Sequence, residues 1–541
     1  MKINRKRTVL WLLSVMIGIQ IRAKPNVLLI FVDDMGYADL SCYGGELTPT
    51  PNIDSLARDG VRFTDGYATS SVCAPSRCAL LSGAYNQRFG MQWNEDQYDG
   101  AGYTYPDNHK LMPEIFAANG YITGHTGKWN VRRDAKKVFH ETSHEMNWKG
   151  HYFQDAQGGF LGVDGHGGNA INDDELHAWG PDDQDKPYLT DVLTDNAIGF
   201  IERHSAEKRP FFYYLAYNAV HTPLQARMTK EFDHLPNEPL RIYAAMVQSL
   251  DQNVGRLLET LRKCGITDNT IVAFASDNGP AMGNPNIKGW HSEWPERVLL
   301  GSSAPLKGHK AQYYEGGVRI PYILRWPGVL RAGTIYSHPV STMDFYPTFC
   351  AAAKIEIPES TMLDGVNLLP YLNDQKQGSP HEYLFWKHNN LGAVRRGKWK
   401  LVITTWQPKI ALYDLDKDIG ESVNLAKESA EITETLRRAW EDWSADLPPR
   451  ANPPPETTQG TLTGVFQPTT VQTQKEGKPF SAWMVIDDQG QEHITYYRQL
   501  KAKMVHKEIK ALEGKRVRIT GRIVFSQKRS YFEIIEVIEE L

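Results

Sequence analysis

The sequence predicts an α/β fold, in which an open sheet carries helices on both faces and two smaller units follow it. The first observation is that NVLLIFVDD (26–34) and TIVAFASDNG (270–279) are continuous apolar runs that end in polar residues. Such runs are typical of strands buried on both faces in a parallel sheet. The second is that PFFYYLAYNAVHTP (210–223) predicts another buried strand. Because helical stretches separate these runs, strands and helices alternate along the chain, which favours the open sheet.

Three stretches predict the intervening helices: IDSLARDG (53–60), MPEIFAANG (112–120) and AAMVQSLDQNVGRLLETLRKCG (244–265). The last two end at glycine, which commonly terminates helices. In an open sheet of this kind, ligands bind at the carboxyl ends of the strands. The polar residues expected there are Asp33, Asp34, His221, Asp277 and Asn278. A single acid at such a position is more often a helix cap or a turn residue, but two strands with the same ending favour a shared site.

The chain changes character near residue 385. LGAVRRGKWKLVI (391–403) and KIALYDLDKD (409–418) predict antiparallel strands, and EITETLRRAWEDW (431–443) predicts a helix, so we expect a small α+β subdomain here. LPPRANPPPETTQG (447–460) predicts a linker, because its prolines disfavour both helices and internal strands. The expected division is a signal peptide at 1–23, a catalytic α/β domain at 24–375, the C-terminal subdomain at 376–446, the linker at 447–460 and a β-barrel at 461–541.

The last segment has a recognisable order of elements. Three strands are predicted first, and the third is EHITYYR (492–498). A helix follows at LKAKMVHKEIKALEG (500–514), and two further strands complete the segment. Three strands, a helix and two strands is the order of an OB-fold barrel. Such barrels bind nucleic acids or sugars in other proteins, but a structural or docking module is the preferred interpretation here.

Charge and composition exclude some classes of partner. The chain has 541 residues and a net charge of −4, so it offers no general attraction to nucleic acid, and none is expected as a partner. A basic segment precedes the apolar run from Val9 to Ile21, which is typical of a secretory signal and is too short for a comfortable membrane span. We therefore expect a periplasmic or secreted protein with no membrane span after signal removal. Its five cysteines are odd in number, so they cannot all form internal disulfides.

Two of those cysteines lie in SVCAPSRCALLSG (71–83). Pro75 is well tolerated at the start of a helix, so Cys73 is expected at the positive end of a helix, where an anion is stabilised. A buried, inert thiol is the alternative, since free cysteines are usually buried. Cys78 lies on the same predicted helix, and we interpret it as core packing.

The sequence CAPSR followed by LLSG resembles the signature of the type I sulfatases, in which the cysteine is oxidised to formylglycine. Further segments resemble the same family in the same order: VDDMGYADLSCYG (32–44), TGKW (126–129), SDNGP (276–280) and LKGHKAQYYEGGVRIP (306–321). The resemblance covers roughly residues 25 to 450, and it implies the alkaline phosphatase-like fold and a sulfuric ester hydrolase, with a carbohydrate sulfatase expected.

The resemblance also implies a metal site and a nucleophile. The implied metal ligands are Asp33, Asp34, Asp277, Asn278 and the converted Cys73. An all-oxygen, mostly anionic ligand set suits a hard cation, Ca²⁺ by family, with Mg²⁺ as the alternative. Formylglycine at position 73 would form a gem-diol that attacks sulfur, and a formylglycine-generating or anaerobic sulfatase-maturating enzyme is implied as a partner.

Further roles carry over position by position. Arg77 would steady the diol, Lys128 and Lys310 would bind sulfate, and His221 would contact sulfate and protonate the leaving oxygen. Each has an ordinary alternative, such as a solvent-exposed lysine or a structural histidine.

One position departs from the family pattern. Much of the family has a histidine where this chain has Asn130, and asparagine cannot take a proton at neutral pH. Either His125 or His309 replaces it as a base, or sulfate elimination is slow. Asn130 can still hydrogen-bond, so it is expected to bind substrate together with Lys128, His221 and Lys310.

Aromatic and cationic residues near these motifs favour a sulfated polysaccharide or oligosaccharide over a simple aryl sulfate, because aromatic faces stack on sugar rings. They are Trp129, Arg132, Arg133, Lys136, Lys137, Trp148, His151, Tyr152, Trp290, His291 and Trp294. Two alternatives remain: a phosphoesterase or phosphonate hydrolase of the same superfamily, and a glycan-binding protein that has lost turnover. The first would need a second set of metal ligands, and the second is supported by Asn130.

Overall fold

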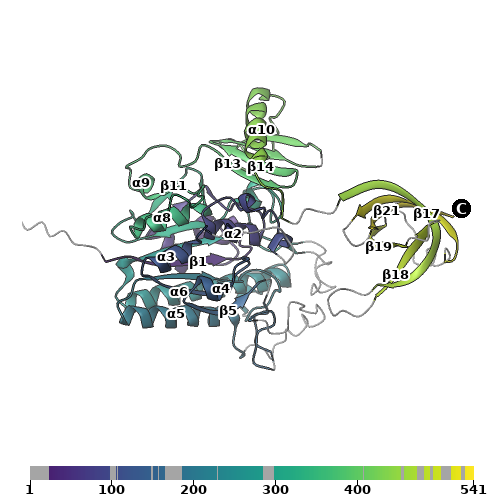
Figure 1. The fold of residues 1–541 in the computed structure, drawn as a ribbon. Coiled ribbons are helices and arrows are strands. Elements are labelled where there is room, and N and C mark those ends of the chain that lie inside the picture. The colour runs from purple at the N-terminus through teal and green to yellow at the C-terminus, as the bar shows by residue number, and fades with distance from the viewer. Residues whose placement is uncertain are drawn as a thin grey trace, which may run out of the picture. The chain divides into compact units, whose positions relative to one another are not determined.

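The computed structural model divides the chain into two compact units, Met1–Asn452 and Pro453–Leu541 (Figure 1). The residues that the structure describes are 23–97, 105–106, 108–147, 150–155, 157–164, 185–227, 230–283, 298–405, 407–451, 456–471, 480–487, 492–500, 513–525 and 530–540. The expected signal segment therefore lies almost entirely outside the described residues. Within the described part of the chain, no helix combines the length and apolar character that a membrane crossing requires.

An eight-stranded sheet forms the centre of the first unit. Its strand order is β11 (Thr334–Tyr336), β2 (Val61–Phe63), β10 (Tyr322–Arg325), β7 (Thr270–Ser276), β1 (Asn26–Val32), β6 (Phe211–Ala216), β4 (Ile122–Lys128) and β5 (Glu141–Met146). The five strands from β7 to β5 are parallel, and the apolar runs predict three of them, β1, β6 and β7. β10 runs antiparallel to both β7 and β2, so the sheet is mixed.

Helices cover both faces of this sheet, which confirms the predicted layering (Figure 1). Alternate residues of β1 point to opposite faces. Leu28, Ile30 and Val32 pack into one core, which includes residues of α1 (Pro51–Arg58), α5 (Leu189–Ala206) and α6 (Glu238–Lys263). Val27, Leu29 and Phe31 pack into the other, which includes residues of α2 (Cys73–Ser82), α3 (Met112–Ala118) and α8 (Phe345–Ala352). Both faces of β1 are buried, as its unbroken apolar sequence requires.

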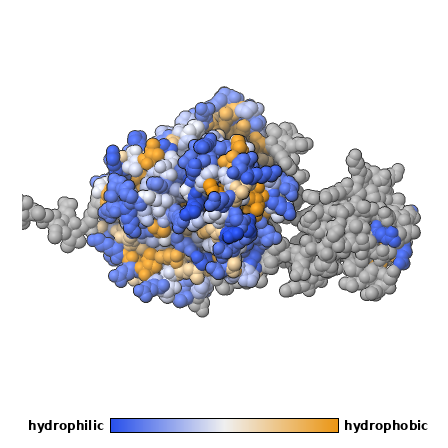
Figure 2. Space-filling view, turned by 90° about the horizontal axis from the view of Figure 1, so that it is seen from above, coloured by the Kyte–Doolittle hydropathy of each residue, from blue (hydrophilic) through white to orange (hydrophobic). Residues whose placement is uncertain are grey.

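A smaller antiparallel sheet completes the first unit. Its strands are β13 (Leu384–His388), β14 (Leu391–Arg396), β15 (Trp399–Ile403) and β16 (Ile410–Asp414), and α10 (Ala430–Ala445) packs on it through Leu436 and Trp440. The expectation of antiparallel strands followed by a helix is therefore confirmed. Figure 2 shows hydrophilic residues over most of one face of this unit, with several separate hydrophobic patches between them.

Among the described residues of the second unit, five strands pair in a closed ring. Their order is β17 (Glu456–Val471), β18 (Phe480–Asp487), β19 (Glu492–Leu500), β21 (Ser530–Glu540) and β20 (Arg516–Phe525). β19 and β21 are parallel, and the other neighbours are antiparallel. Most of the helix expected at 500–514 lies outside the described residues, so the OB-fold assignment stays a prediction.

Candidate active site

The carboxyl ends of β1 and β7 bring two pairs of polar residues together. The strands are parallel neighbours with Val32 opposite Ser276, so the residues that follow each strand meet at the same edge. The backbone N–H of Asp34 donates to Oδ1 of Asp277 at 3.2 Å, and Nδ2 of Asn278 donates to Oδ1 of Asp34 at 2.7 Å. The two acidic segments, far apart in sequence, therefore converge, as their shared strand endings predict.

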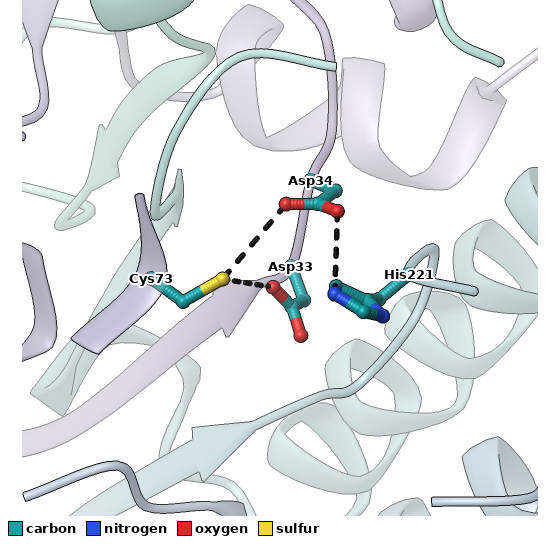
Figure 3. A group of neighbouring side chains, drawn as sticks. All are labelled: Asp33, Asp34, Cys73 and His221. Carbon is teal, nitrogen blue, oxygen red and sulfur yellow. Dashed lines mark hydrogen bonds and ion pairs between the residues drawn. The ribbon is translucent and has the colours of Figure 1, made fainter. Parts of the chain in front are cut away.

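Cys73 is the first residue of α2, a ten-residue helix, and its side chain points at these acids (Figure 3). Its Sγ lies 3.3 Å from Oδ1 of Asp33 and 3.9 Å from Oδ1 of Asp34. His221 approaches from the other side, with Nε2 3.5 Å from Oδ2 of Asp34. One ligand atom from each of these four residues lies within 4.8 Å of the others.

Three cationic side chains surround the acids. Lys310 Nζ lies 2.7 Å from Oδ1 of Asp34 and 3.4 Å from Sγ of Cys73. Lys128, the last residue of β4, donates to Oδ2 of Asp33. The third cation, Arg77, is fully buried one turn into α2, and its Nη2 lies 2.7 Å from Oδ2 of Asp277. The site is therefore lined by both signs of charge.

Burial and these charges shift several pKa values. Burial alone would raise the pKa of Asp34, but Lys310, His221 and Lys128 hold it well below its usual range. Burial and the nearby Asp33 raise the pKa of Asp277 to about 6, despite Arg77. Burial, Asp277 and Asp33 raise the pKa of the Cys73 thiol far above its usual range. An unmodified Cys73 would therefore stay protonated and would be a poor nucleophile at neutral pH.

Hydrogen bonds hold both the ring and the backbone of His221. Its Nδ1 donates to the carbonyl of Thr222 at 2.6 Å, and the hydroxyl of the buried Tyr152 donates to the carbonyl of His221 at 2.9 Å. Burial, Lys310 and Lys128 lower the pKa of His221 to about 3, although Asp34 opposes them. With Nδ1 protonated, the neutral ring presents an unprotonated Nε2 to the site.

The donor set fits a hard cation. Three carboxylates and one carboxamide converge from the ends of two strands, and Asp33, Asp34 and Asp277 are at most 2% exposed. Oδ1 of Asn278 is buried and has no hydrogen-bond partner among the described residues, so it is available as a ligand. Oxygen ligands of this kind suit Ca²⁺, or Mg²⁺ with fewer protein ligands.

The two histidines suggested as replacement bases lie in different surroundings. His125 is buried, its Nδ1 contacts Thr142, and its ring stacks on Phe139 and Tyr214. Burial and Arg77 lower its pKa to about 3. Nδ1 of His309 donates to the carbonyl of the adjacent Lys310 at 2.9 Å.

Asn130 is buried and has a positive φ of 53°, in the left-handed region that asparagine tolerates better than most residues. Its Nδ2 donates to the carbonyl of Asn147. This bond holds the side chain in place at the end of the segment that begins with Lys128.

Two aromatic residues that were predicted to contact a sugar are buried, so these two predictions are wrong. Trp129 is 1% exposed, and its Nε1 donates to the carbonyl of Arg133, so it packs in the core and offers no face to a sugar. Tyr152 is also fully buried and acts as a support for His221. Trp148, Trp290, His291 and Trp294 lie outside the described residues. Cys78 is fully buried in the core beside Leu80 and Leu81, which agrees with its interpretation as a packing residue.

Two further residues contact the site and were not predicted from the sequence. Oδ1 of Asn94 accepts a hydrogen bond from the backbone N–H of Ala74 at 3.0 Å, directly beside Cys73. The hydroxyl of Tyr214 lies 3.4 Å from Nη1 of Arg77. Asn94 lies in no recognisable motif, and an aromatic residue inside an apolar strand predicts only burial.

Comparison with known proteins relates the chain to one family. The family model described as "Sulfatase" matches residues 25–355, and the one described as "N-sulphoglucosamine sulphohydrolase, C-terminal" matches residues 309–445. The chain is 34% identical over 405 residues to "Uncharacterized sulfatase YdeN" of Escherichia coli (strain K12), covering 68% of this chain and 69% of that protein. It is 31% identical over 400 residues to the human "N-acetylgalactosamine-6-sulfatase", covering 71% and 72%.

A solved structure is similar over a wider range. The crystal structure of "Ps i-CgsB in complex with k-i-k-neocarrahexaose" superposes with a TM-score of 0.66 and 32% identity, covering 79% of this chain and 94% of that chain. That crystal structure contains bound k-i-k-neocarrahexaose.

Proposed function

Because the chain belongs to the sulfatase family and is a sulfuric ester hydrolase, we propose that it removes sulfate from a sulfated polysaccharide or oligosaccharide. Relatives named as an N-acetylgalactosamine-6-sulfatase and as a structure with a bound neocarrahexaose support a glycan substrate. Members of this family use formylglycine and a metal, and we propose both for this chain.

One observation carries the proposal: Cys73 starts α2 and directs its side chain at Asp33, Asp34 and Lys310. As a thiol it would be a poor nucleophile in this setting, because burial and nearby carboxylates raise its pKa. Oxidation to formylglycine would supply a hydrated aldehyde, which is a nucleophile that does not require a thiolate.

The chain's own cations would bind and orient the sulfate group. Lys310 contacts Asp34 and Lys128 contacts Asp33, so a sulfate bound beside these two acids would have two fixed positive charges near its oxygens. Arg77 remains paired with Asp277, and it also donates to the carbonyl of Lys128 at 3.2 Å, which places it behind the sulfate-binding lysine.

His221 would move a proton at Nε2. Its Nδ1–H is committed to Thr222, so the ring can donate from Nε2 only in its doubly protonated form. Burial, together with Lys310 and Lys128, disfavours that form in the free site. A bound sulfate ester would offset their charge and raise the pKa of His221, which suits a group that protonates the leaving oxygen.

The metal would be held by Asp33, Asp34, Asp277 and Asn278. When bound, it would supply a Lewis acid that stabilises negative charge at the reacting oxygens. Lys310 also contacts Asp34 directly, so a protein cation offsets part of the negative charge of these acids in addition to the metal.

The experiment combines mass spectrometry with sulfate release. The peptide containing residue 73 should carry an aldehyde in place of the thiol, and the protein should release sulfate from N-acetylgalactosamine 6-sulfate glycans or carrageenan oligosaccharides. Cys73→Ala should abolish release, and Cys78→Ala, on the same helix, is the matched control. An unmodified Cys73 in fully active protein would contradict the mechanism. Release of phosphate alone from phosphate esters would select a phosphoesterase, and glycan binding without release would select a binding protein.

Three finer points complete the proposal. The order of the strands from 456 to 540 supports an OB-like barrel.

The basic and apolar character of residues 1–23 supports export to the periplasm or the medium. A maturation enzyme that oxidises Cys73 would act as a partner, and co-expression with such an enzyme should raise the fraction of modified peptide.

A further inference from the structure

A stacked pair of rings lies close to the start of α2, the helix that begins with Cys73. The rings of Trp93 and His388 have centroids 4.2 Å apart and an angle of 15° between their planes. Trp93 is followed by Asn94, whose side chain is hydrogen-bonded to Ala74, the residue after Cys73. The pair therefore lies a short distance along the chain from the reactive position.

Hydrogen bonds fix this pair from both sides. Gln92, which precedes Trp93, accepts from the backbone N–H of Asn389 at 2.8 Å. Arg450 joins the same group, with Nε 2.9 Å from Oδ1 of Asp96 and Nη1 3.2 Å from Nε2 of His388. Residues separated by hundreds of positions in sequence thus hold the two rings in one orientation, and both rings are only half-buried.

The pair carries no net charge, so it favours an uncharged ligand such as an unsulfated sugar ring. Burial and Arg450 lower the pKa of His388 to about 4, so the ring is neutral at neutral pH. The positive charge of Arg450 is matched by Asp96. The cluster therefore offers an aromatic surface and hydrogen-bonding edges, and no unmatched cation for a second sulfate group.

We propose that Trp93 and His388 form a subsite for the sugar ring next to the sulfated one, which binds by stacking and edge hydrogen bonds. The inference rests on the proposed function and deepens it, because it makes a sugar chain of at least two rings the preferred substrate. Trp93 and His388 would act as specificity-determining residues and take no part in the reaction at sulfur.

The test compares a sulfated oligosaccharide that the wild type desulfates with the sulfated monosaccharide from its reactive end. KM is measured for each, or the inhibition constant where the monosaccharide is not turned over. Trp93→Ala should raise the KM for the oligosaccharide roughly tenfold more than the KM or inhibition constant for the monosaccharide, as the loss of one aromatic stacking contact predicts. Trp93→Phe should restore most of the difference, and His388→Ala should act in the same direction.

Trp443→Ala is the matched control, because Trp443 also stacks on an aromatic ring of the small sheet, Phe385, with centroids 4.8 Å apart. It should lower the melting temperature without changing the ratio between the two ligands. If Trp93→Ala weakens the binding of both ligands equally, or weakens the binding of neither, the subsite is overturned while the sulfatase proposal stays intact. A wild type that releases no sulfate from any glycan would overturn the proposed function, and the subsite with it.

Discussion

Arg77 Nη2 lies 2.7 Å from Oδ2 of Asp277, and both side chains are fully buried. The pair ties α2, the helix that begins with Cys73, to the end of β7, so Arg77 is no surface residue of α2. The guanidinium also lies over the ring of Phe31, 5.3 Å from its centroid. These contacts fix the distance between Cys73 and the second acidic segment.

Arg77→Met should therefore destabilise the protein strongly. Removing one partner of a buried ion pair leaves an uncompensated charge, at a cost of about 3–5 kcal/mol. Thermal unfolding should show a clear drop in melting temperature, together with loss of sulfate release. Arg88→Met is the control: its pair with Asp364 is partly exposed, so a far smaller loss, about 1 kcal/mol or less, is expected. Equal losses in the two variants would contradict the structural role of Arg77.

Calcium should stabilise the protein through the acid cluster. A ligand that binds only the folded state adds about 2.7 kcal/mol at a concentration 100 times its Kd. Adding Ca²⁺ after chelation should raise the melting temperature, and Asp34→Asn should remove most of this response. Asp251→Asn is the control, because Asp251 is a buried carboxylate that accepts from Asn52 and Ile53. A response that survives in Asp34→Asn would place the cation elsewhere, and a larger response to Mg²⁺ would change its assignment.

Much of the fold was predictable because its central strands are apolar on both faces. Continuous apolar runs predict β1, β6 and β7, and the polar residues at two of their ends predict the acid cluster. The antiparallel β10 (Tyr322–Arg325) was not predicted, because a run of four residues carries too little periodicity to give a direction.

The site features that the sequence did not predict depend on contacts that form only in the folded chain. A tryptophan in a loop motif is compatible with both a core and a sugar contact, and Trp129 belongs to the core. Trp93 and His388, which are 295 positions apart in sequence, meet only in the folded chain. Asn94 likewise contacts the helix start through a bond that no local pattern reveals.

His381 should make stability depend on pH. Burial alone would lower its pKa, but Asp344, with Oδ1 2.8 Å from Nε2, raises the pKa above the usual 6.5. A raised folded-state pKa stabilises the protein fully below about pH 6.5, and this contribution is lost as the pH rises through the folded-state value. The stability difference between wild type and His381→Gln should therefore be larger at pH 6 than at pH 9. Denaturant unfolding at both pH values measures it, with the exposed His234→Gln as the control. A difference that stays constant or grows with pH would contradict this pairing.

Lys400 should act as a positioning residue for Lys310. Its Nζ lies 2.7 Å from Oε1 of Glu315, both side chains are fully buried, and the backbone N–H of Glu315 donates to Oε2 of Glu421 at 2.6 Å. The small sheet thereby anchors the loop that carries Lys310 into the site. Lys400→Met should cost about 3–5 kcal/mol, as loss of a buried partner does. It should also lower kcat/KM at temperatures where the variant remains folded, since the loop loses its anchor. Lys398→Met, which removes a partly exposed lysine paired with Asp414, should leave kcat/KM near the wild-type value. Wild-type kcat/KM in folded Lys400→Met would show that the anchor serves stability alone.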